Sequence, residues 1–161
     1  MAELVDLERR ITLMEERTAI EHLKYAYWRH LDLKQWEPLR ALFAADATVN
    51  YSSGKYEFRG IDAIMKFLTE SLSRDRGAMT IHHGHHPEIE ITGPTKAKGT
   101  WALYNYMYNV KQNRAIRIGA YYHDDYVKLD GAWKFQHIGY QNIFHEEWKR
   151  DDLPSINLVV G

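Results

Sequence analysis

Cysteine is absent from this sequence of 161 residues. Its absence excludes a disulfide framework, a thiol nucleophile and a metal site built from thiolates, and it is consistent with the reducing cytoplasm. A chain of this length suits a single domain and buries roughly 70% of the surface that its unfolded form exposes, so it needs no disulfide or structural metal. We therefore expect one domain over residues 1–161.

Long apolar runs and an excess of either charge are missing as well. No segment approaches the roughly 20 consecutive apolar residues that span a bilayer. The first residues are charged from Glu3 onward, without the apolar core of a signal peptide. The 21 Lys and Arg residues are matched by 22 Asp and Glu residues, which leaves no basic surface for nucleic acid or an anionic membrane. The sequence predicts a soluble, cytoplasmic protein whose partners include neither membrane nor nucleic acid.

Aromatic residues and histidine, in contrast, are abundant. Aromatics make up 13% of the chain, with 11 Tyr and 5 Trp, and there are 9 His. Tyr and Trp combine a large apolar body with a polar tip, which suits a pocket for a mostly apolar ligand that carries oxygen. The alternative is that these aromatics fill a core or an interface.

Apolar residues recur at every third or fourth position over residues 3–31, which is the spacing of a helix face. Residues 16–18 interrupt the pattern, so this stretch predicts either two helices or one kinked helix. Further helices are expected over residues 36–45 and 61–72. The apolar positions of the long stretch form two runs, the first being Leu4, Leu7, Ile11 and Met14 and the second Ile20, Leu23, Tyr27 and Leu31.

Beyond residue 78 the apolar residues alternate as in β-strands. Helices followed by long antiparallel strands indicate an α+β fold, in which three to four helices pack on one face of a strongly curved sheet. Such a sheet leaves a cone-shaped hollow, where we expect a pocket. The tail from residue 146 is expected to be irregular and to pack on a neighbouring subunit or over the pocket mouth. Strands are predicted over residues 79–86, 88–92, 96–110, 114–129 and 133–144.

Asp32 is the first candidate for chemistry. It follows Leu31 and precedes Leu33 in an apolar stretch, so its carboxylate is expected to be partly desolvated and to need a hydrogen-bonding partner. The alternative is that Asp32 caps the next helix, which is expected to begin near Lys34.

Four histidines, His82, His83, His85 and His86, surround Gly84 and raise the question of a metal site. Successive side chains of a strand point to opposite faces, so at most two of the four converge without a bulge. We therefore predict no metal, and one inward histidine that acts as a general base.

Strand alternation also selects two amides. Asn105 shares a strand face with Trp101 and Leu103, and Asn142 shares one with Tyr140 and Phe144. A buried amide needs a partner or a ligand, although either amide could also bond to backbone at the edge of the core. The chain contains no phosphate-binding loop, nucleophile elbow, dinucleotide fingerprint or calcium loop.

Taken in order, these segments resemble a known family. The chain is similar to the SnoaL-like branch of the nuclear-transport-factor-2-like superfamily, which contains scytalone dehydratase, hexachlorocyclohexane dehydrochlorinase and bile acid 7α-dehydratase, and it resembles the last of these most. The resemblance covers residues 20–148 and rests on AYWRHLDLKQW, NYSSGK, IHHGHHPEI, GTWAL, GAYYHDDYVKLDGAWKF and GYQNIF.

The resemblance implies catalytic roles for Tyr27, Asp32 and His82. Two positions depart from the bile acid enzyme, because Asn105 replaces an aspartate and Asn142 replaces an arginine. These replacements leave the pocket roughly neutral and argue against a bile acid coenzyme A substrate.

The family implies a cofactor-free, dehydratase-like lyase that acts on a small, cyclic, mostly apolar ketone or hydroxylated ring. His82 would abstract a proton, Asp32 would orient it, and Tyr27 and Asn105 would stabilise the oxyanion, with Trp101, Tyr140 and Asn142 also around the substrate. The alternatives are ketosteroid-type isomerisation, polyketide cyclisation, or ligand binding without catalysis. Relatives also lead us to expect a homo-oligomer, a trimer before a dimer, formed through the outer face of the sheet.

Overall fold

The computed structural model describes residues 2–153 and residue 155. The chain begins with helices α1 (Ala2–Leu33) and α2 (Trp36–Arg40), strands β1 (Phe43–Tyr51) and β2 (Tyr56–Arg59), and helix α3 (Ile61–Leu72). A short 3-10 helix (Arg74–Arg76) precedes the long strands β3 (Ala78–Gly93), β4 (Lys96–Asn109), β5 (Arg114–Leu129) and β6 (Ala132–Lys149), and a second one (Arg150–Asp152) follows them.

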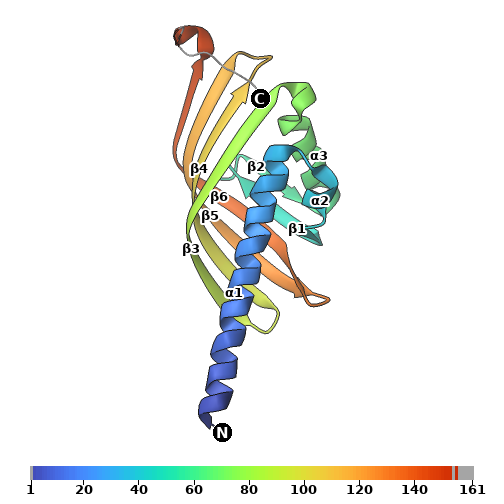
Figure 1. The fold of residues 1–161 in the computed structure, drawn as a ribbon. Helices are drawn as coiled ribbons and strands as arrows, with labels where there is room; N and C mark the ends of the chain where they lie inside the picture. The colour runs from blue at the N-terminus through green and yellow to red at the C-terminus, as the bar shows by residue number, and fades with distance from the viewer. Residues whose placement is uncertain (1, 154, 156–161) are drawn as a thin grey trace.

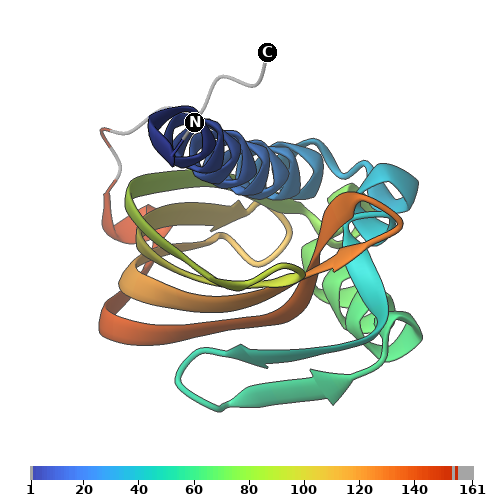
Figure 2. The ribbon, with the colours of Figure 1, turned by 90° about the horizontal axis from the view of Figure 1, so that it is seen from below.

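The six strands form one sheet in the order β2-β1-β6-β5-β4-β3. Neighbouring strands are antiparallel except β1 and β6, which are parallel. The long strands twist and curl, and α1 lies along β3 with its buried face toward the concave side, while α3 covers β1 and β2 (Figures 1 and 2). This arrangement confirms the predicted α+β class and the curved, mostly antiparallel sheet.

Several predicted boundaries were wrong. Helix α1 is continuous through residues 16–18, and α2 ends at Arg40, because Phe43 already pairs with β6. The two segments predicted over 79–86 and 88–92 form the single strand β3, with a register shift between His85 and Glu88. The tail is not irregular from residue 146, because β6 continues to Lys149 and a 3-10 helix follows over Arg150–Asp152. The predicted packing of the tail also involves residues 154 and 156–161, which lie outside the described residues.

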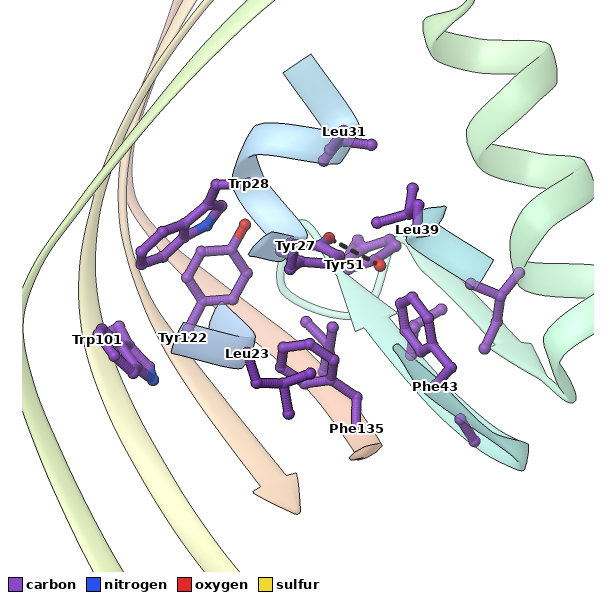
Figure 3. Close-up of a cluster of buried hydrophobic side chains, with 14 of the residues drawn as sticks. Leu23, Tyr27, Trp28, Leu31, Leu39, Phe43, Tyr51, Trp101, Tyr122 and Phe135 are labelled. Atoms are coloured by element: carbon purple, nitrogen blue, oxygen red, sulfur yellow. Dashed lines mark hydrogen bonds between the residues drawn. The ribbon is translucent and has the colours of Figure 1, made fainter. Parts of the chain in front are cut away.

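Buried side chains, many of them aromatic, form a packed core between α1 and the sheet (Figure 3). It encloses an ion pair between Lys24 of α1 and Asp124 of β5, with Nζ 2.6 Å from Oδ2 and both side chains 0% exposed. Tyr126 donates a hydrogen bond to the same carboxylate oxygen, and the Lys24 ammonium lies 3.5 Å from the centre of the Tyr122 ring. Burial lowers the pKa of Lys24 to about 8 and raises the pKa of Asp124. No helix in the described part of the chain is long and apolar enough to cross a membrane.

Candidate active site

A cavity of about 360 Å³ lies between α1, α3 and the sheet. Its size is typical of sites for small molecules, and its wall combines apolar with polar side chains. The polar side chains in its wall come from Tyr27, Tyr51, Ser52, Lys55, Tyr56, Ser71, Thr80, His82, Asn105, Arg114, Tyr122, Tyr140, Asn142 and His145. Among the described residues that line the cavity there is no Asp or Glu.

Asp32 and His82 form a hydrogen-bonded pair at this cavity. The distance from Asp32 Oδ1 to His82 Nδ1 is 2.6 Å, and the two side chains are 12% and 6% exposed. The His82 backbone N–H donates to Asp32 Oδ2 at 2.9 Å, and Thr80 Oγ1 donates to Oδ1 at 2.8 Å. Asp32 therefore faces β3 and does not cap α2. Gln35 precedes α2 and has no side-chain capping bond there.

The hydrogen bonds determine how the proton is distributed in this pair. Burial opposes ionisation of Asp32, but the bonds and charge from His82 and the bond from Thr80 outweigh it, so its pKa lies below the ordinary value. An ionised carboxylate can only accept hydrogen bonds, which assigns the ring hydrogen of neutral His82 to Nδ1. Because His82 also lines the cavity, its second nitrogen, Nε2, is the one available to a ligand as a base.

Gly84 allows α1 and β3 to approach closely enough for this contact. A Cβ atom at Gly84 would lie 1.7 Å from Cη2 of Trp28, so any larger residue would push the helix away. Trp28 precedes Asp32 by four residues, one helical turn, and Gly84 follows His82 by two residues on the same strand face. The glycine within the histidine cluster thus contributes directly to the geometry of the pair.

The register of the strands places four side chains in one row across the sheet. His82 on β3 pairs with Asn105 on β4, which pairs with Ile118 on β5, which pairs with His145 on β6. All four line the cavity. The carbonyl oxygen of the Asn105 side chain is buried and makes no hydrogen bond to any described residue. Asn105 therefore presents an unsatisfied acceptor directly beside His82.

A bulge in β6 explains why the sequence did not reveal His145. Gly119 pairs with Phe144, but the next residue, Ala120, pairs with Asn142, so Ile143 is an extra residue. The insertion reverses the alternation, and His145 lines the cavity while Phe144 is 41% exposed. The prediction that Phe144 shares the inner face with Asn142 was wrong for this reason. Asn142 does line the cavity, and its side-chain oxygen is also buried without a hydrogen bond to the described residues.

Five tyrosines lie in the cavity wall, namely Tyr27, Tyr51, Tyr56, Tyr122 and Tyr140. Tyr27 and Tyr51 hydroxyls lie 3.2 Å apart (Figure 3), and Tyr140 lies 3.0 Å from the Ser52 hydroxyl. Burial raises the pKa of Tyr27 and Tyr122 well above the usual value, so both remain protonated hydrogen-bond donors. The sequence prediction missed Tyr51 and Tyr122. Tyr51 follows inward-facing residues at alternate positions of β1, a signal that could have identified it.

Trp101 lies outside the cavity wall, although the prediction placed it at the substrate. It is 0% exposed and donates a hydrogen bond from Nε1 to the Tyr126 hydroxyl in the solid core. The inner face of a long strand spans both the core and the cavity, so alternation alone cannot distinguish them.

The other histidines of the cluster do not join His82. His83, His85 and His86 are all exposed, and His86 has a positive φ of 52° at the bulge of β3. Within the described residues, no three His, Asp or Glu side chains are grouped as a metal site would require.

Solved structures with the same architecture include enzymes. A protein from Novosphingobium aromaticivorans provisionally assigned as a scytalone dehydratase is 28% identical, with a TM-score of 0.77 over 86% of this chain and 91% of that chain. A hexachlorocyclohexane dehydrochlorinase from Novosphingobium barchaimii is 22% identical, with a TM-score of 0.77 over 97% and 99% of the two chains. A second such dehydrochlorinase, of type 2, is 22% identical with a TM-score of 0.79 over 96% and 97%.

These similarities confirm the predicted nuclear-transport-factor-2-like fold. The family model for the SnoaL-like domain matches residues 12–139. This range contains α1 from Thr12 onward, both members of the Asp32–His82 pair and most of the sheet. The chain belongs to the family of SnoaL-like domains.

Proposed function

We propose that this protein is a cofactor-free lyase that eliminates water or another leaving group from a small, cyclic, mostly apolar ketone or hydroxylated ring. The observation that carries the proposal is the Asp32–His82 pair, in which an ionised carboxylate orients a histidine at the wall of a largely apolar cavity. The names of the similar structures, a dehydratase and dehydrochlorinases, support an elimination. The two unsatisfied amide oxygens of Asn105 and Asn142 suit a substrate that carries hydroxyl donors.

His82 acts as the general base in this mechanism. Nε2 takes a proton from the carbon next to a carbonyl group, and the C–H electrons form an enolate. The Tyr27 hydroxyl and the Asn105 amide donate hydrogen bonds to the enolate oxygen. Collapse of the enolate forms a C=C bond and breaks the bond to the leaving hydroxyl at the adjacent carbon. The imidazolium then protonates the departing hydroxide, so water leaves and neutral His82 is restored.

Asp32 supports this cycle without touching the substrate. Its carboxylate holds the Nδ1–H tautomer and stabilises the imidazolium that forms when Nε2 is protonated, as the acid does in a catalytic triad that lacks its nucleophile. General base catalysis of this kind typically contributes about 10²–10⁴-fold in rate.

The test compares His82→Asn with His83→Asn, the neighbouring exposed histidine, which provides a matched control. Each protein is incubated in heavy water with scytalone, hexachlorocyclohexane and a 3-keto steroid. NMR follows product formation with all three and, for the two ketones, exchange of the α proton. We expect elimination by the wild type and by His83→Asn, and a loss of at least about 100-fold in His82→Asn with the fold retained in circular dichroism spectra.

Other outcomes distinguish the alternatives. Exchange of the α proton without loss of a leaving group would replace the lyase with an isomerase or cyclase at the same pair. Tight binding with neither exchange nor product, and no effect of Asp32→Asn beyond affinity, would indicate a binding protein. Normal elimination by His82→Asn would refute the proposal.

A further inference from the structure

Lys34 closes helix α1 in a backbone conformation that usually belongs to glycine. The Lys34 N–H donates to the Leu31 carbonyl oxygen at 3.3 Å. The next N–H, that of Gln35, donates to the His30 carbonyl oxygen at 2.8 Å. These two bonds form a Schellman motif, whose left-handed residue is most often glycine because a Cβ atom is unfavourable there. Lys34 occupies that place with a φ of 61°, so the end of the helix does not explain why this residue is lysine.

The side chain of Lys34 reaches the strand that carries His82. Its ammonium donates to Thr80 Oγ1 at 2.8 Å, and Thr80 Oγ1 in turn lies 2.8 Å from Asp32 Oδ1. An ammonium group can only donate hydrogen bonds, so the Thr80 oxygen accepts from Lys34 and its single hydrogen is directed to the carboxylate. Lys34 thereby fixes the direction of a hydrogen bond that would otherwise depend on a freely rotating hydroxyl. Lys34 itself lies outside the cavity wall.

The surroundings of Lys34 oppose its charge as well as its backbone conformation. The residue is half-buried, and desolvation lowers the pKa of its ammonium to about 8; the Asp32 carboxylate opposes this shift and the Arg74 charge adds to it. Unfavourable conformations that the surrounding structure maintains are typical of functional sites. At neutral pH Lys34 is still charged, so a cation lies near the carboxylate that orients His82.

We propose that Lys34 is a positioning residue for the Asp32–His82 pair. Through Thr80 it holds Oδ1 of Asp32 in place, and its charge favours the ionised carboxylate. A fixed, ionised carboxylate keeps the ring hydrogen of neutral His82 on Nδ1 and leaves Nε2 as the base. The catalytic part of this inference rests on the function proposed above, whereas the effect on Asp32 does not.

Replacement of Lys34 by glycine separates this role from a structural one. Glycine suits the left-handed position, so the melting temperature of Lys34→Gly should equal or exceed that of the wild type. Asp32 loses a nearby cation and the fixed direction of its bond from Thr80, so the pKa of Asp32 should rise. The value of kcat should fall by about 3–10-fold, roughly the contribution of one hydrogen bond. KM should not change, because Lys34 lies outside the cavity wall.

Two further variants provide controls. Lys34→Arg keeps a cation that only donates hydrogen bonds, so it should retain the Asp32 pKa and the kcat of the wild type. Asp130 also has a positive φ, of 50°, in the exposed turn between β5 and β6. Asp130→Gly therefore relieves a similar backbone conformation away from the pair and should leave both values unchanged.

Three measurements on the full-length variants test the proposal. Calorimetry gives the melting temperature, the NMR signal of the Asp32 carboxyl carbon across pH gives its pKa, and steady-state kinetics with the best substrate of the panel above gives kcat and KM. A wild-type pKa of Asp32 or a wild-type kcat in Lys34→Gly would overturn the proposal.

Other outcomes separate this inference from its neighbours. A lower melting temperature in Lys34→Gly, or losses in Lys34→Arg as large as those in Lys34→Gly, would also overturn the proposal, because either would show that the lysine is required for packing. A wild type that eliminates nothing from any substrate of the panel would refute the proposed function alone. The NMR titration of Asp32 needs no substrate and would still decide whether Lys34 positions the carboxylate.

Discussion

Two carboxylate pairs with the same N–O distance connect α1 to the sheet and differ in what surrounds them. Asp32–His82 and Lys24–Asp124 both have an N–O distance of 2.6 Å. In the first pair, His82 lines the cavity and leaves one ring nitrogen available there. In the second, both side chains are 0% exposed, and Asp124 Oδ2 accepts hydrogen bonds from Lys24 and Tyr126. The two contacts have the same length, so the chemical role that we propose for Asp32–His82 depends on the access of His82 to the cavity and not on the contact itself.

The two pairs should also differ in energetics. A fully buried ion pair contributes little net stability, because desolvation offsets the attraction, but removal of one partner leaves an uncompensated charge in the core. The pKa of Lys24, lowered by burial to about 8, reflects this desolvation. Asp32 instead has its pKa lowered overall, since hydrogen bonds to its ionised form outweigh burial.

The largest expected effect is on catalysis by Asp32→Asn. The amide cannot stabilise the imidazolium and no longer enforces the Nδ1–H tautomer, so kcat should fall by about 10²–10⁴-fold. Steady-state kinetics with the best substrate from the panel above checks this, with exposed Asp46→Asn as control. A variant with full activity would show that the pair is only a structural contact.

The largest effect on stability is expected from Lys24→Met. The free energy of unfolding should fall by about 3–5 kcal/mol, because Asp124 remains buried without its cation. Urea denaturation measures the loss. The double variant Lys24→Met/Asp124→Asn should recover most of it, since it removes both charges and keeps an acceptor for Tyr126. A double variant as unstable as Lys24→Met would contradict this account of the core pair.

Thr80→Val should have an intermediate effect on activity. Thr80 donates to Asp32 Oδ1 and accepts from Lys34 Nζ at 2.8 Å, so the substitution removes one of the bonds that orient the carboxylate. A hydrogen bond to a charged group corresponds to a loss of about 10-fold or more in kcat/KM. Thr80→Ser keeps the hydroxyl and should retain activity. Equal losses of kcat/KM in Thr80→Val and Thr80→Ser would instead show that the packing of the Thr80 side chain matters and its hydroxyl does not.

The sequence predicted the features of this site that depend on local patterns, but not those that depend on contacts between residues far apart in the chain. The α+β order followed from local periodicity, and resemblance selected Asp32 and His82 as partners. The inward position of His145 could not be read, because it depends on a one-residue bulge that only the pairing of β5 with β6 reveals. The prediction wrongly placed Trp101 at the cavity. Strand alternation identifies the inner face of β4, but only the tertiary structure shows which part of that face is packed in the core and which part lines the cavity.

The smallest expected effect is on stability in acid. The pKa of Asp32 is lower in the folded protein than the ordinary value of 3.8, so its ionisation contributes stability that is complete above that value and is lost as the pH falls through the folded pKa. The difference in unfolding free energy between the wild type and Asp32→Asn should therefore narrow below about pH 4. A difference that stays constant on acidification would indicate that His82 and Thr80 do not stabilise the carboxylate.

The central claim, that Asp32–His82 is the chemical pair, is tested most directly by the rate of α-proton abstraction in His82→Asn measured beside His83→Asn. The account predicts a loss of at least about 100-fold in the first variant, with wild-type exchange in the second and both proteins folded. Wild-type exchange by His82→Asn would contradict it and would assign the cavity to binding or to another base.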